Sequence, residues 1–422
     1  MPLVNIRDML HHARRQGYAL GGFAVSNLDE LDAVITAAEA CRSPVMLGIS
    51  HRGTPAVQFG ALLAAAEHVA RHASVPVGLR YEYAAELGIS ELAIRDGCNG
   101  IAVDVTQLTW PDKQVLIRQI GDMTGACGIP LEAMIGLLPA EWNDQAASAK
   151  TESEPPSAEA IDDFVQRTGV DSIALVVEPG PGPLKKSDVA RQYFDRVNVA
   201  VSVPLVVYGA NALQQDDLRS FVAWGVAAVH FTLEDATSGQ MSTHDKLDKQ
   251  DLQGQRRDEL QEFVQECIRS IGCAERAAEV LADCPPWEPV EHVIVFNVES
   301  DGKLDTAKVL AEGREVLSKI PGVRYVYTGQ AITSGAAYQF CWLVRFVHAA
   351  VIDSYREHPA HKKFADELFR PIAPSRMSID FHLTTSMQSP LHQDTAELAE
   401  ARQGVMAGDD SVAGETGKSS AA

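Results

Sequence analysis

Short apolar runs rich in Val, Ile and Ala alternate with longer segments of helical period from residue 18 to about residue 235. This alternation is typical of parallel strands joined by crossover helices. Four runs begin with proline, which suits a strand's first position because no ladder donor is needed there. The predicted strands are Ala19–Val25, Pro44–Ile49, Pro76–Arg80, Gly100–Val105, Pro130–Ile135, Ser172–Val177, Pro204–Tyr208 and Ala227–Phe231. Eight such strands predict an α/β fold, a closed (β/α)8 TIM barrel.

The period changes after Cys284-Pro285-Pro286-Trp287, because consecutive prolines block a helix. The order strand, helix, strand, strand, helix, strand then indicates a ferredoxin-like α+β domain. Its predicted elements are His292–Val298, Thr306–Ile320, Val323–Thr328, Ala337–Phe346, Ala349–His358 and Met377–Leu383. We therefore expect a barrel over residues 1–284, an α+β domain over 285–388, and a disordered tail over 389–422, which is rich in Gly, Ser, Ala, Asp and Glu.

Composition narrows the classes of partner. The 36 Lys and Arg stand against 57 Asp and Glu, a net charge of -21, which disfavours nucleic acid and anionic membranes. The seven cysteines show neither a disulfide framework nor a CxxC pair. The first residues are too polar for a signal peptide, and no apolar run approaches the ~18 residues of a membrane span. We expect a cytoplasmic protein.

The first 283 residues resemble the class II, zinc-dependent ketose-bisphosphate aldolases. The matching segments are Met1–Val4, Gly22–Leu28, Ser43–Ser50, Leu131–Ala133, Pro204–Val207 and Arg256–Gly272. In that family three histidines hold a zinc that stabilises an enediolate while an aspartate shuttles a proton. The resemblance places Tyr83, Pro181 and Tyr208 at the three histidine positions. Proline cannot ligate zinc and a phenol titrates near ~10, so we expect neither this zinc nor another cofactor.

Other family positions keep polar side chains. Glu82 stands at the aspartate's place and is the predicted proton shuttle, with Lys185 and Arg80 as partners of an oxyanion. Because Gly209–Ala212 replaces the phosphate-binding cluster, the expected substrate is a carbonyl compound without two phosphates. The predicted substrate-binding residues are Ser26, Ser50, Arg80, Tyr83, Asp104, Glu132, Glu178, Tyr208, Asn211 and His230. The alternative is a solvated rim of structural ion pairs and packing aromatics, and a hard divalent ion among the acidic residues stays open.

Residues 288–385 resemble the stress-responsive dimeric α/β-barrel (Dabb) family. The matching segments are His292–Phe296, Ile320–Val323, Tyr355–His361 and Leu368–Ile372. In enzymes of that family, polyketide cyclases among them, residues like Tyr355 and His361 face a histidine like His292. An imidazole can remove a carbon-bound proton and a phenol can donate to the enolate oxygen. Alternatively, His358-Pro359 only ends a helix and begins a turn.

Three functional hypotheses follow. The first is an aldolase-like carbon–carbon lyase or enolising enzyme that acts on a carbonyl substrate without zinc. The second is a catalytically silent barrel that serves as a scaffold, with a dimerising Dabb domain. The third is a conventional ketose-bisphosphate aldolase. Both resemblances imply a homodimer or homotetramer.

Overall fold

The computed structural model describes residues 3–51, 55–84, 87–138, 155–177, 188–213, 215–233, 249–299 and 305–383. Met1–His382 forms one compact unit. The second unit is Leu383–Ala422, and the described part of the chain reaches only its first residue. The predicted disordered tail lies outside the described residues. Within the described ranges, no helix combines the length and the apolar character needed to cross a bilayer.

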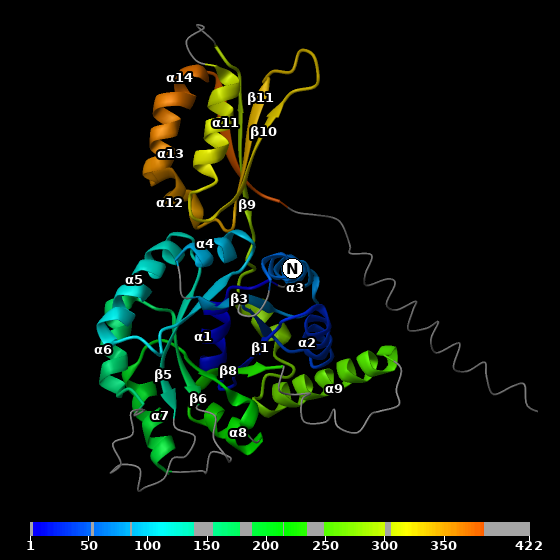
Figure 1. Ribbon diagram of the computed structural model, residues 1–422, viewed down its shortest axis with the longest axis vertical. Helices are drawn as coiled ribbons and strands as arrows, with labels where there is room; N and C mark the ends of the chain where they lie inside the picture. The colour runs from blue at the N-terminus through cyan, green and yellow to red at the C-terminus, as the bar shows by residue number, and fades with distance from the viewer. Residues whose placement is uncertain are drawn as a thin grey trace, which may run out of the picture. The chain divides into compact units, whose positions relative to one another are not determined.

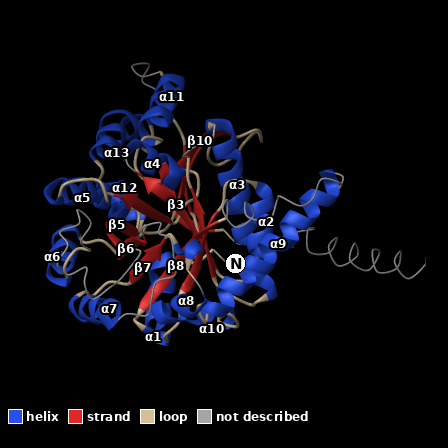
Figure 2. Cartoon of the chain, turned by 60° about the horizontal axis from the view of Figure 1, so that its bottom comes forward, coloured by secondary structure: helices blue, strands red, loops and turns tan. Residues whose placement is uncertain are grey.

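Eight parallel strands close into a barrel, which confirms the predicted fold (Figure 2). The strands are β1 Leu20–Ala24, β2 Val45–Ile49, β3 Val77–Ala84, β4 Gly100–Asp104, β5 Leu131–Leu138, β6 Ser172–Val177, β7 Leu205–Tyr208 and β8 Val226–Thr232. Each prediction overlaps one observed strand. The four prolines directly precede their strands instead of opening them, so the first ladder donor belongs to the next residue.

Helices surround the strands of the barrel (Figure 2). They are α1 Ile6–Gln16, α2 Leu28–Ala40, α3 Ala56–His72, α4 Leu87–Arg95, α5 Trp110–Ala126, α6 Ala158–Thr168, α7 Asp188–Ala200, η2 Ala210–Ala212, α8 Gln215–Ala223, α9 Lys249–Ser270 and α10 Ala277–Asp283. Helix α2 shows why these segments begin where they do. The Asn27 side chain accepts from the Glu30 N–H and so satisfies one of the free donors of the first turn.

The second domain is a four-stranded antiparallel sheet in the order β10-β11-β9-β12, as the ferredoxin-like pattern predicts (Figure 1). Its strands are β9 Val290–Phe296, β10 Val323–Gln330, β11 Phe340–Phe346 and β12 Arg376–His382. Its helical segments are α11 Thr306–Leu317, α12 Val351–Glu357, α13 Pro359–Phe364, η4 Ala365–Phe369 and α14 Arg370–Ile372. These helices lie along one side of the sheet (Figure 1).

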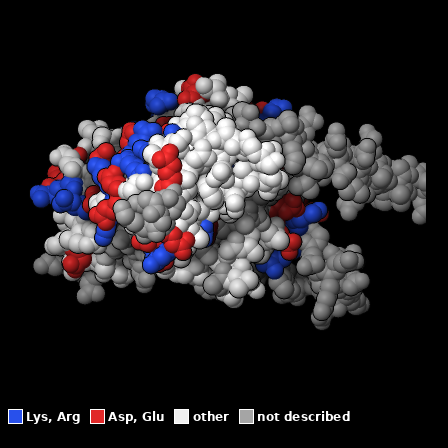
Figure 3. Space-filling view, turned by 90° about the horizontal axis from the view of Figure 1, so that it is seen from above, with Lys and Arg blue, Asp and Glu red and all other residues white. Residues whose placement is uncertain are grey.

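The two faces of this sheet differ. On the helix side, Trp342 and Phe296 are buried, with ring centroids 5.8 Å from Phe364 and 4.9 Å from Phe369, respectively. On the other side, large apolar side chains remain 36–57% exposed. They are Tyr327, Leu343, Met377, Ile379 and Phe381. Seen from above, this end of the molecule shows a broad area without Lys, Arg, Asp or Glu beside a densely charged one (Figure 3). We call the side of the sheet that carries these five exposed side chains the open face.

Polar contacts connect the second domain to the barrel within the compact unit. Arg324 donates from Nη1 and Nη2 to the two carboxylate oxygens of Glu67 on α3, at 2.6 and 2.7 Å. The Ser354 hydroxyl on α12 donates to the carbonyl of Ala126 on α5 at 2.7 Å. Burial raises the pKa of Glu67, but the bonds and charges of Arg324 and Arg71 outweigh it and lower that pKa overall.

Candidate functional site

Five of the predicted residues meet inside the barrel. Alternate residues of β3 point inward, which brings Arg80 and Glu82 into the interior. Glu132 comes from β5, Tyr208 from β7 and His230 from β8, and all five are at most 3% exposed. We call these residues the barrel cluster.

Ionic contacts link the barrel cluster. The Nη2 of Arg80 lies 3.0 Å from Glu82 Oε1, and its Nη1 lies 2.8 Å from Glu132 Oε2. His230 Nδ1 lies 3.1 Å from Glu82 Oε1, and its Nε2 contacts the Arg80 guanidinium. Nδ1 also lies 3.0 Å from Arg80 Nη2. Because a carboxylate only accepts and a guanidinium only donates, a neutral imidazole with its proton on Nδ1 can donate to Glu82 and accept from Arg80 through Nε2.

The second carboxylate is satisfied by hydroxyls. Tyr208 donates to Glu132 Oε1 at 2.8 Å, and Ser172 donates to Glu132 Oε2 at 3.0 Å. Tyr208 also stacks on His230, with ring centroids 4.4 Å apart. Ser172 was missed in the sequence because a small hydroxyl at the start of a strand carries no signal of its own.

Burial and pairing set the ionisation of these groups. Burial raises the pKa of Glu82, but the hydrogen bonds from His230 and Arg80 and the charge of Arg80 outweigh it and hold that pKa at about 2. Burial, followed by the charge of Arg80, lowers the pKa of His230, and burial raises the pKa of Tyr208. At neutral pH Glu82 is therefore an ionised acceptor. A base with so low a pKa is poorly matched to proton transfer near pH 7.

Tyr83 lies next to the barrel cluster on a strained backbone. The pairing of β3 with β4 contains one extra residue between Tyr81 and Ala84, and Tyr83 has φ +59°. A bulky residue in this left-handed region costs about 1–3 kcal/mol. Its ring makes an edge contact with Tyr208, with centroids 6.4 Å apart. The bulge thus directs a partly exposed phenol ring beside a buried polar centre.

Four other predicted barrel residues lie at or shortly after the ends of β1, β2, β4 and β7. Ser26 donates to Glu30 through its N–H and its hydroxyl, and Asp104 accepts from the N–H and hydroxyl of Thr106. Asn211 accepts from the Thr232 N–H and donates to its carbonyl, which fastens the end of β8. Ser50 is half-buried and directly follows the last residue of β2. Glu178, Pro181 and Lys185 lie outside the described residues.

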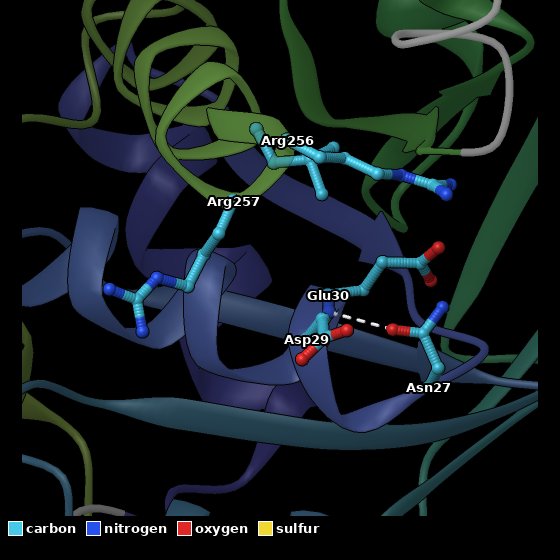
Figure 4. A pocket seen from close by; sticks show the side chains of 6 residues that line it. Asn27, Asp29, Glu30, Arg256 and Arg257 are labelled. Atoms are coloured by element: carbon cyan, nitrogen blue, oxygen red, sulfur yellow. Dashed lines mark hydrogen bonds between the residues drawn. The ribbon is translucent and has the colours of Figure 1, made fainter. Parts of the chain in front are cut away.

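A pocket of about 100 Å³ lies between the starts of α2 and the described part of α9 (Figure 4). Its lining residues are Asn27, Asp29, Glu30, Arg256, Arg257 and Leu260. The two arginines extend in different directions from α9 (Figure 4), and Arg257 lies 3.3 Å from Asp32. Two cationic and two anionic side chains balance one another, so the pocket favours neither an anion nor a cation.

The three predicted residues of the second domain also meet. The ring of Tyr355 on α12 lies 4.3 Å from His361 on α13 and 6.0 Å from His292 on β9. Tyr355 is 2% exposed, whereas His361 is half-buried. His358 ends α12 and caps α13, accepting from the Ala360 N–H, so His358-Pro359 ends one helix and begins another.

Asp380 is a member of this second site that the sequence did not reveal. It pairs with His292 across β12 and β9, and its Oδ1 lies 2.6 Å from His292 Nδ1. Arg356 Nη2 donates to its other oxygen at 3.0 Å. The signal was an acidic residue within an alternating strand, but finding its partner required the order of the strands.

Comparison with known proteins matches each of the two domains to a family model. Residues 4–276, well over half of the chain, match the family model for class II fructose-bisphosphate aldolase. The chain belongs to this aldolase family. Residues 290–383 match the stress responsive A/B barrel domain. The predicted resemblances to the aldolases and to Dabb are thereby confirmed.

Relatives within the aldolase family are distant but cover the whole barrel. The chain is 24% identical over 288 residues to a probable fructose-bisphosphate aldolase of Bacillus subtilis (strain 168), covering 66% of this chain and 100% of that protein. It is 22% identical over 288 residues to a fructose-bisphosphate aldolase of Staphylococcus aureus (strain Mu50), with the same coverage. The solved YdjI aldolase of Escherichia coli K12 aligns with a TM-score of 0.56 at 25% identity, covering 65% of this chain and 99% of that one.

Two side chains of the barrel cluster are unsuited to holding a zinc ion. Burial raises the pKa of Tyr208, which opposes the phenolate that a metal would need. The cation among the two carboxylates is the guanidinium of Arg80. In the stretches that the structure describes, no group of three or more His, Cys, Asp or Glu is arranged to hold a metal.

Proposed function

We propose that this member of the aldolase family enolises a carbonyl substrate without zinc, using acid–base groups of its second domain. The observation that carries the proposal is the convergence of His361, Tyr355 and His292, with Asp380 bound to His292 at 2.6 Å. A carboxylate that orients an imidazole beside a phenol is a common arrangement for moving protons. The expected substrate is a carbonyl compound that does not carry two phosphates.

His361 has the properties of the general base. Its Nδ1 lies 3.2 Å from the carbonyl oxygen of Arg356, which only accepts, so the neutral ring carries its proton on Nδ1 and its lone pair on Nε2. Burial is the main cause that lowers the pKa of His361, and the nearby His292 lowers it further. The base is therefore unprotonated at neutral pH and ready to accept a proton from carbon.

Tyr355 and His292 complete the set. Burial raises the pKa of Tyr355, so its hydroxyl stays protonated and acts as a hydrogen-bond donor. The Asp380 carboxylate accepts from Nδ1–H of His292 and fixes the orientation of that ring. In the proposed step, Nε2 of His361 takes the proton next to the carbonyl. The C–H electrons form the enolate, whose oxygen accepts from Tyr355. Attack of the enolate carbon on a second carbonyl breaks the C=O π bond and gives an alkoxide, which takes the proton back from His361. The reverse sequence cleaves the carbon–carbon bond.

A buried barrel cluster favours a second candidate function, a barrel that serves only as a scaffold. The five members are paired with one another through ionic contacts and hydrogen bonds, so they leave few free donors and acceptors for a substrate. We further propose that a second copy of the chain covers the open face, since burying its exposed apolar side chains stabilises a pair.

Deuterium exchange into acetylacetone and dihydroxyacetone, followed by proton NMR, tests the enolising function. The full-length chain is expected to exchange the protons next to the carbonyl, and His361→Ala and Tyr355→Phe are expected to lose at least about tenfold in rate. His68→Ala, at an exposed position on α3, is the matched control and is expected to keep the rate. Absence of exchange with every variant and the wild type would favour the scaffold. Zinc-dependent cleavage of fructose bisphosphate would instead support the third hypothesis, a conventional ketose-bisphosphate aldolase.

A further inference from the structure

The guanidinium of Arg80 lies between two carboxylates in the barrel, bound at 3.0 Å to Glu82 and at 2.8 Å to Glu132. The imidazole of His230 contacts the same guanidinium. We propose that Arg80 is a built-in cation that replaces the divalent metal of the aldolase family, and that it closes this barrel to metal ions. This inference is independent of the acid–base chemistry proposed for the second domain.

The side chains around Arg80 are of the kinds that ligate divalent cations. Carboxylate oxygens and imidazole nitrogens bind zinc and other divalent ions. Here Glu82 and His230 contact each other and Arg80, while Glu132 contacts Arg80 and two hydroxyls. Two buried carboxylates without a cation would be strongly unfavourable in a site of low dielectric constant. A positive charge is therefore needed at this point, and the chain itself supplies it.

The neighbouring strands are shaped to accommodate this arrangement. A Cβ at Gly48 of β2 would lie 2.3 Å from the carboxyl carbon of Glu82, and a Cβ at Gly22 of β1 would lie 1.9 Å from the ring of His230. Such distances are not tolerated between packed atoms, so both positions leave space for the cluster. In the described residues, Nε and Nη1 of Arg80 have no hydrogen-bond partner although Arg80 is 1% exposed, and Nη1 meets Glu132 as an ion pair at 2.8 Å. The terminal nitrogens therefore make the contacts that hold the guanidinium.

A guanidinium differs from a metal in what it can do. It keeps its charge at every accessible pH, donates hydrogen bonds in a fixed plane, and cannot be removed by a chelator. It also cannot bind a water molecule as a ligand and lower its pKa, as zinc does. The barrel should accordingly be indifferent both to added zinc and to chelators.

The test measures metal content and thermal unfolding of the full-length chain. Protein incubated with ZnCl2 and dialysed against metal-free buffer is analysed by inductively coupled plasma mass spectrometry. We expect far less than one zinc per chain and an unchanged Tm with ZnCl2 or EDTA. Arg80→Ala should lower the Tm, and ZnCl2 or MnCl2 should raise it again, because binding to the folded state stabilises it by mass action. Arg80→Ala combined with Glu132→Gln should lose this rescue.

Two further variants keep the proposal falsifiable. Arg80→Lys keeps the charge and should remain free of metal. If Arg80→Ala does not fold, Arg80→Met combined with Glu132→Gln removes one charge of each sign. That variant should fold, and ZnCl2 or MnCl2 should leave its Tm unchanged. One zinc per chain in the wild type, released by His230→Ala or Glu82→Gln, would overturn the proposal. So would a folded Arg80→Ala that neither ZnCl2 nor MnCl2 stabilises.

Discussion

Gly22 on β1 and Gly48 on β2 leave the space that His230 and Glu82 occupy. Gly48→Ala is expected to destabilise the protein by about 1–3 kcal/mol, because the added methyl group would press on the buried Glu82 carboxyl group. Urea unfolding at pH 7 measures the change. Gly60→Ala on α3 is the control, since no atom lies within 4 Å of the place that its methyl group would take, and it should stabilise the helix by about 0.5–1 kcal/mol. Equal effects of the two substitutions would contradict this packing.

Glu82 should make the free energy of unfolding depend on pH in the acid range. Its pKa is held at about 2 instead of 4.5, so its contribution is fully present above pH 4.5 and is lost as pH falls towards about 2. Glu82→Gln breaks a buried ion pair and should cost about 3–5 kcal/mol at pH 7, and the difference from wild type should narrow below pH 4.5. Urea unfolding between pH 3 and pH 7 measures both. Glu315→Gln, exposed on α11, should differ little from wild type at any pH. A difference for Glu82→Gln that is constant with pH would refute the assignment.

The candidate sites could be predicted only as far as residue type and strand position allow. Arg80, Glu82, Glu132, Tyr208 and His230 meet as expected, because parallel strands of a barrel bring inward side chains together. The sequence did not show that these groups neutralise one another, since that depends on distances near 3 Å. Asp380 was missed for a similar reason, because its partner lies 88 residues away in the chain.

At the scale of the elements, the barrel strands were predicted well and their irregularities were not. Strands β3 and β5 extend beyond their predicted ends, and each contains a register shift. A bulge moves residues to the other face, so alternation stops being a guide where it occurs. The helical segments α13, η4 and α14 were also missed, because Pro359 and Pro371 resemble breakers, although proline suits the first positions of a helix.

The shift in β5 has a specific partner on α5. One extra residue lies between Met134 and Gly136, and the carbonyl of Ile135 accepts from the buried Lys113 Nζ at 2.6 Å. Lys113→Met should therefore destabilise the barrel by about 1–3 kcal/mol, because it leaves a buried carbonyl without a donor. Urea unfolding measures this change.

An exposed lysine provides the control for Lys113. Lys319→Met removes a side chain that is 70% exposed and pairs with Glu315 at the surface, so its effect should stay within about 0.5 kcal/mol. A Lys113→Met variant as stable as Lys319→Met would mean that water satisfies the Ile135 carbonyl equally well.

At the scale of the whole molecule, the open face of the second domain would leave large apolar side chains exposed to water in a monomer. Leu343 is 36% exposed and Ile379 is 42% exposed, and both project from the side of the sheet opposite the helices. Glu291 and Arg345 pair with each other at one end of the same face, so charges there are already balanced. An apolar face with balanced charges suits contact with an identical copy.

Lysine substitutions on the open face should therefore separate the copies. Wild type is expected to sediment at twice the chain mass or more at micromolar concentration. Leu343→Lys combined with Ile379→Lys should sediment as a monomer, because each ~1.4 kcal/mol lost at the interface raises Kd tenfold. Val199→Lys is the matched control, since Val199 is 89% exposed on α7 in the barrel, and it should leave the assembly intact. If the double variant keeps the wild-type mass, the copies associate through the barrel. A monomeric wild type would show that the open face serves another partner.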